Sequence, residues 1–200
     1  MALPQQSFPN PLLPLHQQSD AEMQAYDAIE IVSTFGEPQA EYAAIHNRCA
    51  MMDLPHRGIL EVTGADRHAF LGNLLSNKTW DRDRKQPLSA GEGVYAFLLN
   101  LQGRVVLDVN VIETGERAYL ETDVRLVELL RGVLEKYLFA EKVKLKSAVG
   151  RLHEIALHGP EAPAVLAAAG GVDVASLSKM PTRAPMPMTL LRAIADDLRL

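Results

Sequence analysis

The chain has 200 residues, of which 48% are hydrophobic and 22% are charged, a composition typical of a globular protein. Its formal net charge of −5 argues against non-specific binding to nucleic acid, whose phosphates would repel such a surface. A single cysteine, Cys49, excludes an intramolecular disulfide and a cysteine-clustered metal site. No apolar run approaches the ~18 residues of a membrane helix, and no secretory signal is recognisable. We therefore expect a cytoplasmic protein with no nucleic-acid or membrane partner.

The N-terminal part of the chain divides into two segments. Residues 1–20 are rich in proline and nearly free of charge, which predicts an extended arm. Residues 21–58 are expected to form a helical segment, because Pro38 suits the first turn of a helix. Apolar residues then recur at helical spacing: Tyr42, Ile45, Cys49 and Met52. This amphipathic helix is expected to end near Asp53, because Pro55 and Gly58 follow.

The remainder of the chain alternates between strand and helix patterns. Strands are expected at 59–62, 94–99, 105–112, 118–122, 143–146 and 152–158, with one helix that carries residues 69–75 and further helices near 123–137 and 161–169. The strand connections of hairpin length demand antiparallel pairing, with the helices on one face. We therefore predict an α+β fold with ferredoxin-like antiparallel sheets: one domain over 59–150 and the start of a second over 151–200.

Several reactive side chains are expected to have ordinary structural roles. The six histidines lack the i, i+4 spacing and the partners of a metal site, so we expect no metal. His56, beside Asp53 and Arg57, is interpreted as a surface or helix-terminus histidine rather than a functional one. Cys49 lies on the apolar stripe of its predicted helix, which favours a buried small hydrophobe over a nucleophile.

Asp108 stands inside an otherwise aliphatic strand. The alternation of side chains places Asp108 and Asn110 on one face, while Leu107, Val109 and Val111 lie on the other. The polar face is either the solvated side of a half-exposed sheet or the floor of a polar pocket. In a pocket, the Asp108 carboxylate could hold an amine or orient a ring nitrogen.

Five segments occur in the order known for one protein superfamily. They are Ala50–Gly58, Val62–Gly64, Phe70–Asn77, Gly93–Asp108 and Gly159–Ala162. Together they resemble the N-terminal region of the folate-binding aminomethyltransferase superfamily. That superfamily includes the T-protein of the glycine cleavage system, folate-dependent demethylating oxidases, and YgfZ-type folate-binding proteins implicated in iron–sulfur enzyme maintenance.

The resemblance implies a ring of domains around a tetrahydrofolate cavity. Asp108 matches the aspartate that lies near the reactive nitrogens of the folate, so the resemblance implies a catalytic role for it. The cofactor-binding residues that it implies are Tyr95, Asp108, Asn110, Thr122 and Asp123. Two of these have structural alternatives, since Tyr95 could be a core aromatic and Asp123 a helix cap.

Departures from the T-protein pattern favour the YgfZ-type branch. Arg104 replaces a glycine and Leu107 replaces the first of two aspartates. In a separate departure from the T-protein, Arg57 stands where methionine often contacts the folate. Arg57 could instead face a carboxylate. The chain also stops at Leu200 before the Gly-rich turn and the glutamate of the family, which predicts a truncated second domain with incompletely covered apolar residues.

Three functions remain open at this point. The leading hypothesis is a YgfZ-type tetrahydrofolate-binding protein with a role in one-carbon metabolism or iron–sulfur maintenance. The alternative is an aminomethyltransferase that moves an aminomethylene group from a lipoyl carrier onto tetrahydrofolate. The third is a non-catalytic, truncated interaction module that retains the fold without the ligand. The corresponding partners are a folate, and either a lipoyl carrier or an iron–sulfur protein.

Overall fold

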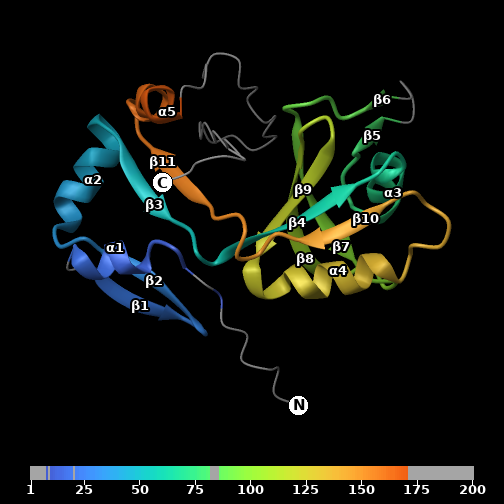
Figure 1. The fold of residues 1–200 in the computed structure, drawn as a ribbon, viewed down its shortest axis with the longest axis horizontal. Helices are drawn as coiled ribbons and strands as arrows, with labels where there is room; N and C mark the ends of the chain where they lie inside the picture. Colours follow the sequence, from blue (N-terminus) through green and yellow to red (C-terminus); the bar gives the residue numbers. More distant parts are fainter. Residues whose placement is uncertain (1–7, 9, 20, 82–85, 171–200) are drawn as a thin grey trace. The chain divides into compact units, whose positions relative to one another are not determined.

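The computed structural model describes Phe8 and residues 10–19, 21–81 and 86–170 of the chain (Figure 1). These residues belong to two compact units. The described parts of residues 1–56 and 153–170 form the first unit, and residues 57–152 contain the sheet of the second. Each unit has its own secondary structure and is described separately below.

The second unit is built on a five-stranded antiparallel sheet. Its strands are β4 (Arg57–Thr63), β7 (Gly93–Leu99), β8 (Val105–Glu113), β9 (Arg117–Asp123) and β10 (Lys144–Ser147). The spatial order is β10-β4-β9-β8-β7, and all neighbours are antiparallel. Without β7, which extends one edge by a hairpin, this is the ferredoxin-like order. The α+β, ferredoxin-like prediction is therefore confirmed.

Two α-helices cover one face of this sheet. They are α3 (Arg67–Leu74) and α4 (Val127–Glu135), and the short 3-10 helix η1 (Val124–Leu126) precedes α4 (Figure 1). Phe70 of α3 and Leu130 of α4 belong to the same buried apolar cluster as Leu60 of β4. Strand alternation places Leu107, Val109 and Val111 of β8 in this cluster and turns Asp108 and Asn110 to the opposite face.

Two glycines of the recognised segments have packing roles. Gly64 ends β4 with a φ of +114°, and a Cβ atom there would lie 1.8 Å from the carbonyl oxygen of Lys142. A Cβ atom on Gly58 would lie 2.9 Å from the Cα of Val124, so β4 approaches η1 too closely for any side chain. At each of these two positions, only glycine fits without a shift of the backbone.

The first unit contains a hairpin, a two-stranded sheet and three helices. The elements are α1 (Leu13–Gln18), β1 (Glu22–Tyr26), β2 (Ile29–Thr34), α2 (Pro38–Asn47), β3 (Ala50–Asp53), β11 (Ile155–His158) and α5 (Ala162–Gly170). β1 pairs with β2, and β3 pairs with β11 across about a hundred residues of chain. This pairing joins residues 50–53 and 155–158, which the sequence analysis assigns to different segments.

The sequence-based description of residues 1–58 is wrong in three details. Residues 13–18 form a helix instead of an extended arm, because Pro14 lies in the first turn, where no backbone N–H is required. Residues 22–34 form a β-hairpin within the segment expected to be helical. The helix that begins at Pro38 ends at Asn47 rather than near Asp53.

The early end of α2 has a tertiary cause. Cys49 lies beyond the helix, and Met52 belongs to β3, whose backbone pairs with β11. A ladder to a distant strand replaces the helical hydrogen bonds that local periodicity predicts. The apolar residues Tyr42 and Ile45 remain exposed on α2, so the expected buried stripe does not form.

Smaller elements complete the description. Trp80–Asp81 (β5) and Gln86–Pro87 (β6) form a two-residue ladder between α3 and β7, where the sequence analysis expects no strand. Residues 171–200 of the predicted truncated second domain, with its incompletely covered apolar residues, lie outside the described residues. In the described part of the chain, no helix is long and apolar enough to cross a membrane.

Candidate functional site

The face of the five-stranded sheet that α3 and α4 leave uncovered carries a row of polar side chains. Strand register places Tyr95 opposite Asn110, Asn110 opposite Glu121, and Asp108 opposite Phe97. Arg57 begins β4 on the same side, as its contact with Glu121 shows. We call Arg57, Tyr95, Asp108, Asn110 and Glu121 the polar face. Asp108 thus lies partly exposed among paired polar side chains on this face of the sheet.

Tyr95 and Asp108 form one end of the polar face. The Tyr95 hydroxyl donates a hydrogen bond of 3.1 Å to Oδ2 of Asp108. Burial of the phenol raises its pKa, and the hydrogen bond and negative charge of Asp108 raise it further. Tyr95 is 48% exposed and makes an edge contact with Phe97, so it is not the core aromatic that the sequence leaves open. A phenol and a carboxylate therefore face outward side by side.

Glu121 lies at the other end and is only 1% exposed. Its Oε2 accepts a hydrogen bond of 2.7 Å from Nδ2 of Asn110. Its Oε1 accepts from Nε of Arg57, which also forms an ion pair with it. Arg57 therefore faces a carboxylate, as the sequence analysis allows. These contacts supply the opposite charge and the donors that a buried carboxylate requires.

Two of the predicted site residues, Thr122 and Asp123, make contacts within the protein that support its structure. Thr122 is fully buried on the same side of β9 as Leu120, and its hydroxyl donates to the backbone carbonyl of Asp108 at 2.8 Å. Asp123 caps η1 by accepting from the backbone N–H of Arg125 at 2.9 Å, and it pairs with the Arg125 guanidinium at 2.7 Å. The structure brings Tyr95, Asp108 and Asn110 together on the polar face, while Thr122 supports the strand beneath Asp108.

Glu121 is the residue that sequence reasoning missed. The alternation of β9 places Tyr119 and Glu121 on the face opposite Leu120, and that pattern was available in the sequence. What the pattern could not provide is the partner, because Arg57 lies 64 positions earlier in the chain.

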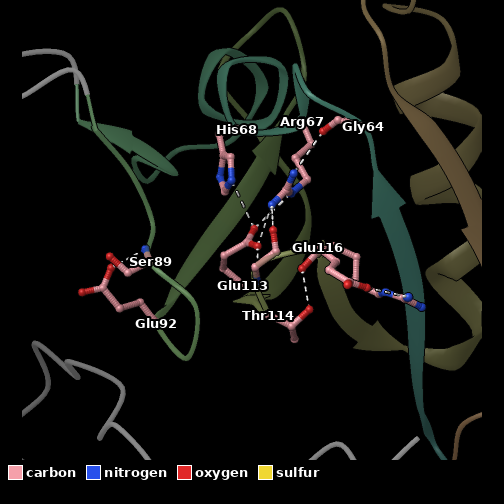
Figure 2. A network of polar contacts seen from close by, with 10 residues as sticks. Gly64, Arg67, His68, Ser89, Glu92, Glu113, Thr114 and Glu116 are labelled. Atoms are coloured by element: carbon pink, nitrogen blue, oxygen red, sulfur yellow. Dashed lines mark hydrogen bonds and ion pairs between the residues drawn. The ribbon is translucent and has the colours of Figure 1, made fainter.

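A second acidic network lies at the end of β8 (Figure 2). Glu113, which is 1% exposed, accepts from Nη2 of Arg67 at 2.8 Å and from Nε at 3.2 Å. The backbone N–H of Gly115 donates to Oε1 at 2.6 Å, and Nε2 of His68 lies 3.3 Å from Oε2. Figure 2 shows Arg67 and His68 pointing from α3 toward Glu113. The network fastens α3 to the β8–β9 turn.

The pKa of His68 depends on its buried position beside Glu113 and Arg67. Burial lowers the pKa of His68, the Glu113 carboxylate raises it, and the Arg67 guanidinium lowers it; the net direction is downward. The imidazole is thus kept neutral beside an ion pair that is already complete. The protein itself supplies the hydrogen-bond donors to the Glu113 carboxylate, so this carboxylate does not need a donor from a ligand. We therefore assign this network a structural role.

A third carboxylate, Asp53 in the first unit, is surrounded by donors. Oδ2 lies 2.7 Å from Nε2 of His16 and 2.9 Å from Nδ2 of Asn10, and Oδ1 lies 2.5 Å from Nε2 of His153. Burial raises the pKa of Asp53, but the hydrogen bonds from His153, His16 and Asn10 outweigh it and hold the pKa below its ordinary value. The cluster ties α1 and the segment before β11 to β3.

The remaining predicted candidates have ordinary surroundings. His56 is partly exposed and makes an edge contact with Tyr26; α2 ends nine positions earlier, at Asn47, so of the two readings, surface or helix terminus, the helix terminus is wrong. Cys49 is partly buried, and its Sγ atom lies 3.9 Å from the Ala50 carbonyl oxygen. Within residues 10–19, 21–81 and 86–170, no group of three or more histidine, cysteine or acidic side chains is arranged to hold a metal ion.

Comparison with known proteins gives consistent matches. A family model described as "GCVT N-terminal domain" matches residues 12–191. The aminomethyltransferase of Chloroherpeton thalassium is 29% identical over 157 residues, which are 78% of this chain and 42% of that protein. The aminomethyltransferase of Rippkaea orientalis is 29% identical over 164 residues, 79% of this chain and 43% of that protein.

A solved structure supports the fold. The crystal structure of glycine cleavage system aminomethyltransferase T from Bartonella henselae superposes with a TM-score of 0.72 at 24% identity. The match covers 86% of this chain and 45% of that one. The chain thus spans less than half the length of the relatives it matches.

Proposed function

Because the chain belongs to the GCVT N-terminal domain family of the folate-binding aminomethyltransferase superfamily, we propose that its polar face binds tetrahydrofolate within an aminomethyltransferase. The curated relatives cited above bear the name aminomethyltransferase, which supports this activity over the YgfZ-type reading that the sequence analysis places first. Iron–sulfur maintenance has no comparable support from these relatives.

The observation that carries the proposal is the incomplete coordination of Asp108. Its half-buried carboxylate accepts a hydrogen bond from the Tyr95 hydroxyl. Among the residues that the structure describes, no lysine, arginine or histidine forms an ion pair with it, whereas Glu113 and Glu121 each have an arginine. A ligand amine or ring N–H would supply the missing donor through a charge-assisted hydrogen bond.

The surroundings of Asp108 fit a reduced pterin. Tyr95 and Phe97 expose aromatic surface beside the carboxylate, against which a flat ring can pack. Tetrahydrofolate, when bound, supplies the nitrogen that receives the one-carbon unit. Asp108 would orient that nitrogen, and Tyr95 would hold the carboxylate in place. Such positioning is a large part of what an enzyme contributes to a group transfer.

Calorimetric titration with tetrahydrofolate tests the binding. We expect the wild-type protein to bind and Asp108→Asn to bind about tenfold more weakly or worse, because the amide lacks the charge. Glu116→Gln is the matched control: it makes the same acid-to-amide change at a side chain that is 87% exposed and lies outside the polar face. Absence of heat at millimolar tetrahydrofolate would contradict the proposal and favour the interaction module.

A transfer assay tests the activity. The protein is mixed with tetrahydrofolate and a lipoyl carrier that bears an aminomethyl group, and formation of methylene-tetrahydrofolate is measured together with the ammonia and the free dihydrolipoyl carrier that the transfer releases. Product formation that Asp108→Asn abolishes would support the aminomethyltransferase. Folate binding without transfer would remove that activity and leave the YgfZ-type function, which Arg104 and the single aspartate of β8 favour.

A further inference from the structure

We propose that Glu121 and Arg57 position the amide of Asn110 so that its Oδ1 atom faces the ligand beside Asp108, which gives the site a second hydrogen-bond acceptor. Asn110 would then help to select ligands with two N–H donors, and Glu121 and Arg57 would be positioning residues. The inference rests on the proposed function, because it concerns the same site and the same ligand.

The orientation of Asn110 follows from the charge of its partner. Glu121 is 1% exposed and forms an ion pair with Arg57, so its carboxylate is ionised and can only accept hydrogen bonds. The Asn110 atom that lies 2.7 Å from Oε2 must therefore be the Nδ2 donor. A carbonyl oxygen in its place would put two acceptors against each other within a buried contact.

This assignment leaves one amide atom for a ligand. The nitrogen and oxygen of an amide project from opposite sides of the side-chain axis, so Oδ1 points away from Glu121. Asn110 is partly exposed, so a molecule bound on the polar face can reach it. Without Glu121, the amide could rotate and present two N–H donors instead.

Asn110 and Asp108 form a matched pair of acceptors. They are two residues apart on one side of β8, so their Cα atoms are roughly 7 Å apart. That separation lies within the span of a fused two-ring heterocycle with N–H groups along its edge. Tyr95 stands directly opposite Asn110 in the strand register while its hydroxyl reaches Asp108, so one phenol borders both acceptors.

Arg57 completes the arrangement by stabilising the charge of Glu121. A carboxylate with so little exposure would otherwise lose its charge or destabilise the fold. The guanidinium donates to Oε1 through Nε, and the Asn110 amide donates to Oε2. Each carboxylate oxygen therefore has its own donor, and the amide has one orientation.

Titration with tetrahydrofolate separates this positioning role from a structural one. We expect Glu121→Gln to weaken binding about tenfold, because a glutamine side chain can donate and permits the Asn110 amide to rotate. The double variant Glu121→Gln/Asn110→Asp should return to within about threefold of wild type, because both oxygens of the new carboxylate accept whatever its rotation. Loss of packing alone would not be rescued in this way. Glu116→Gln again serves as the control.

A measurement without ligand tests the orientation directly. In ¹⁵N-edited NMR spectra, the side-chain NH₂ signals of Asn110 should shift in Glu121→Gln and stay in place in Glu116→Gln. Unchanged Asn110 signals in Glu121→Gln would overturn the inference. If Glu121→Gln does not fold, Asn110→Leu provides the second variant. We expect it to bind about tenfold more weakly, because leucine lacks the Oδ1 acceptor.

The two proposals fail in different ways. If the wild type binds tetrahydrofolate and Asp108→Asn weakens it while Glu121→Gln and Asn110→Leu do not, the inference about Asn110 is wrong and the proposed function stands. If the wild type does not bind tetrahydrofolate, the proposed function is wrong, and the ligand assigned to Asn110 is wrong with it.

Discussion

Glu113 and Asp108 lie on the same strand, β8, yet their surroundings differ in kind. Glu113 turns toward α3, is 1% exposed, and receives Arg67, His68 and the backbone N–H of Gly115. Asp108 turns to the polar face and receives the Tyr95 hydroxyl. The comparison shows that a buried carboxylate is stabilised only when the protein supplies its donors. A carboxylate whose donors are incomplete, at an accessible position, is a candidate for binding.

The largest expected effect is a loss of stability in Glu113→Gln, which would distinguish the structural Glu113 from Asp108. Glu113→Gln should lower the free energy of unfolding by about 3 kcal/mol, because it leaves the buried Arg67 guanidinium without its counter-charge. Urea unfolding followed by circular dichroism measures the change. Glu116→Gln should change stability by less than about 0.5 kcal/mol. Equal stabilities for the Glu113 and Glu116 variants would contradict the assignment of the Glu113 network as structural.

An intermediate effect is expected at Asp53, whose donors are also complete. Asp53→Asn should cost about 2 kcal/mol at neutral pH, because three hydrogen bonds to a buried carboxylate lose their charge assistance. The pKa of Asp53 is lowered in the folded state, so the charge stabilises the fold above the unfolded-state pKa. This contribution is lost as the pH falls below about 4 and through the folded-state pKa.

Urea unfolding of wild type and Asp53→Asn at pH 7, 5 and 3 measures that dependence. We expect the difference between the two proteins to be largest at pH 7 and 5 and to shrink at pH 3. A difference that grows toward pH 3 would show that the sign of the Asp53 pKa shift is wrong.

The smallest effect is expected at Asp108. Asp108→Asn should change the free energy of unfolding by less than about 0.5 kcal/mol, because the carboxylate fills no buried network. The same variant should lower the pKa of the Tyr95 phenol relative to wild type, since Asp108 contributes to raising it. Ultraviolet titration of each protein against its Tyr95→Phe derivative isolates this phenol. A strong loss of stability in Asp108→Asn would place Asp108 with Glu113 instead of with a binding site.

The quality of the sequence predictions depends on the range of the contacts that decide each element. β7, β8 and β9 were predictable because short connections join them and their alternation is local. β3 was read as the end of a helix because its partner, β11, lies about a hundred residues later. α1 was missed because its proline was taken as a helix breaker rather than as a first-turn residue.

The candidate site shows the same division. Strand alternation alone places Asp108 and Asn110 on the face opposite the core, and the structure agrees. Thr122, which the resemblance includes among the cofactor-binding residues, alternates to the buried face of β9, and its hydroxyl donates to the backbone carbonyl of Asp108. Glu121 shows the polar alternation of its strand, but its role depends on Arg57, which belongs to another strand of the sheet.

By itself, the sequence determined the class of fold, the strands of the main sheet and the face on which Asp108 stands. These properties follow from composition and from side-chain periods of 2 and 3.6 residues, which are local. Only the tertiary structure decided which carboxylates are satisfied. Their partners lie far along the chain: Arg67 is 46 positions from Glu113, Arg57 is 64 from Glu121, and His153 is 100 from Asp53. A hydrogen bond requires donor and acceptor to meet within about 3 Å, and folding alone sets that distance.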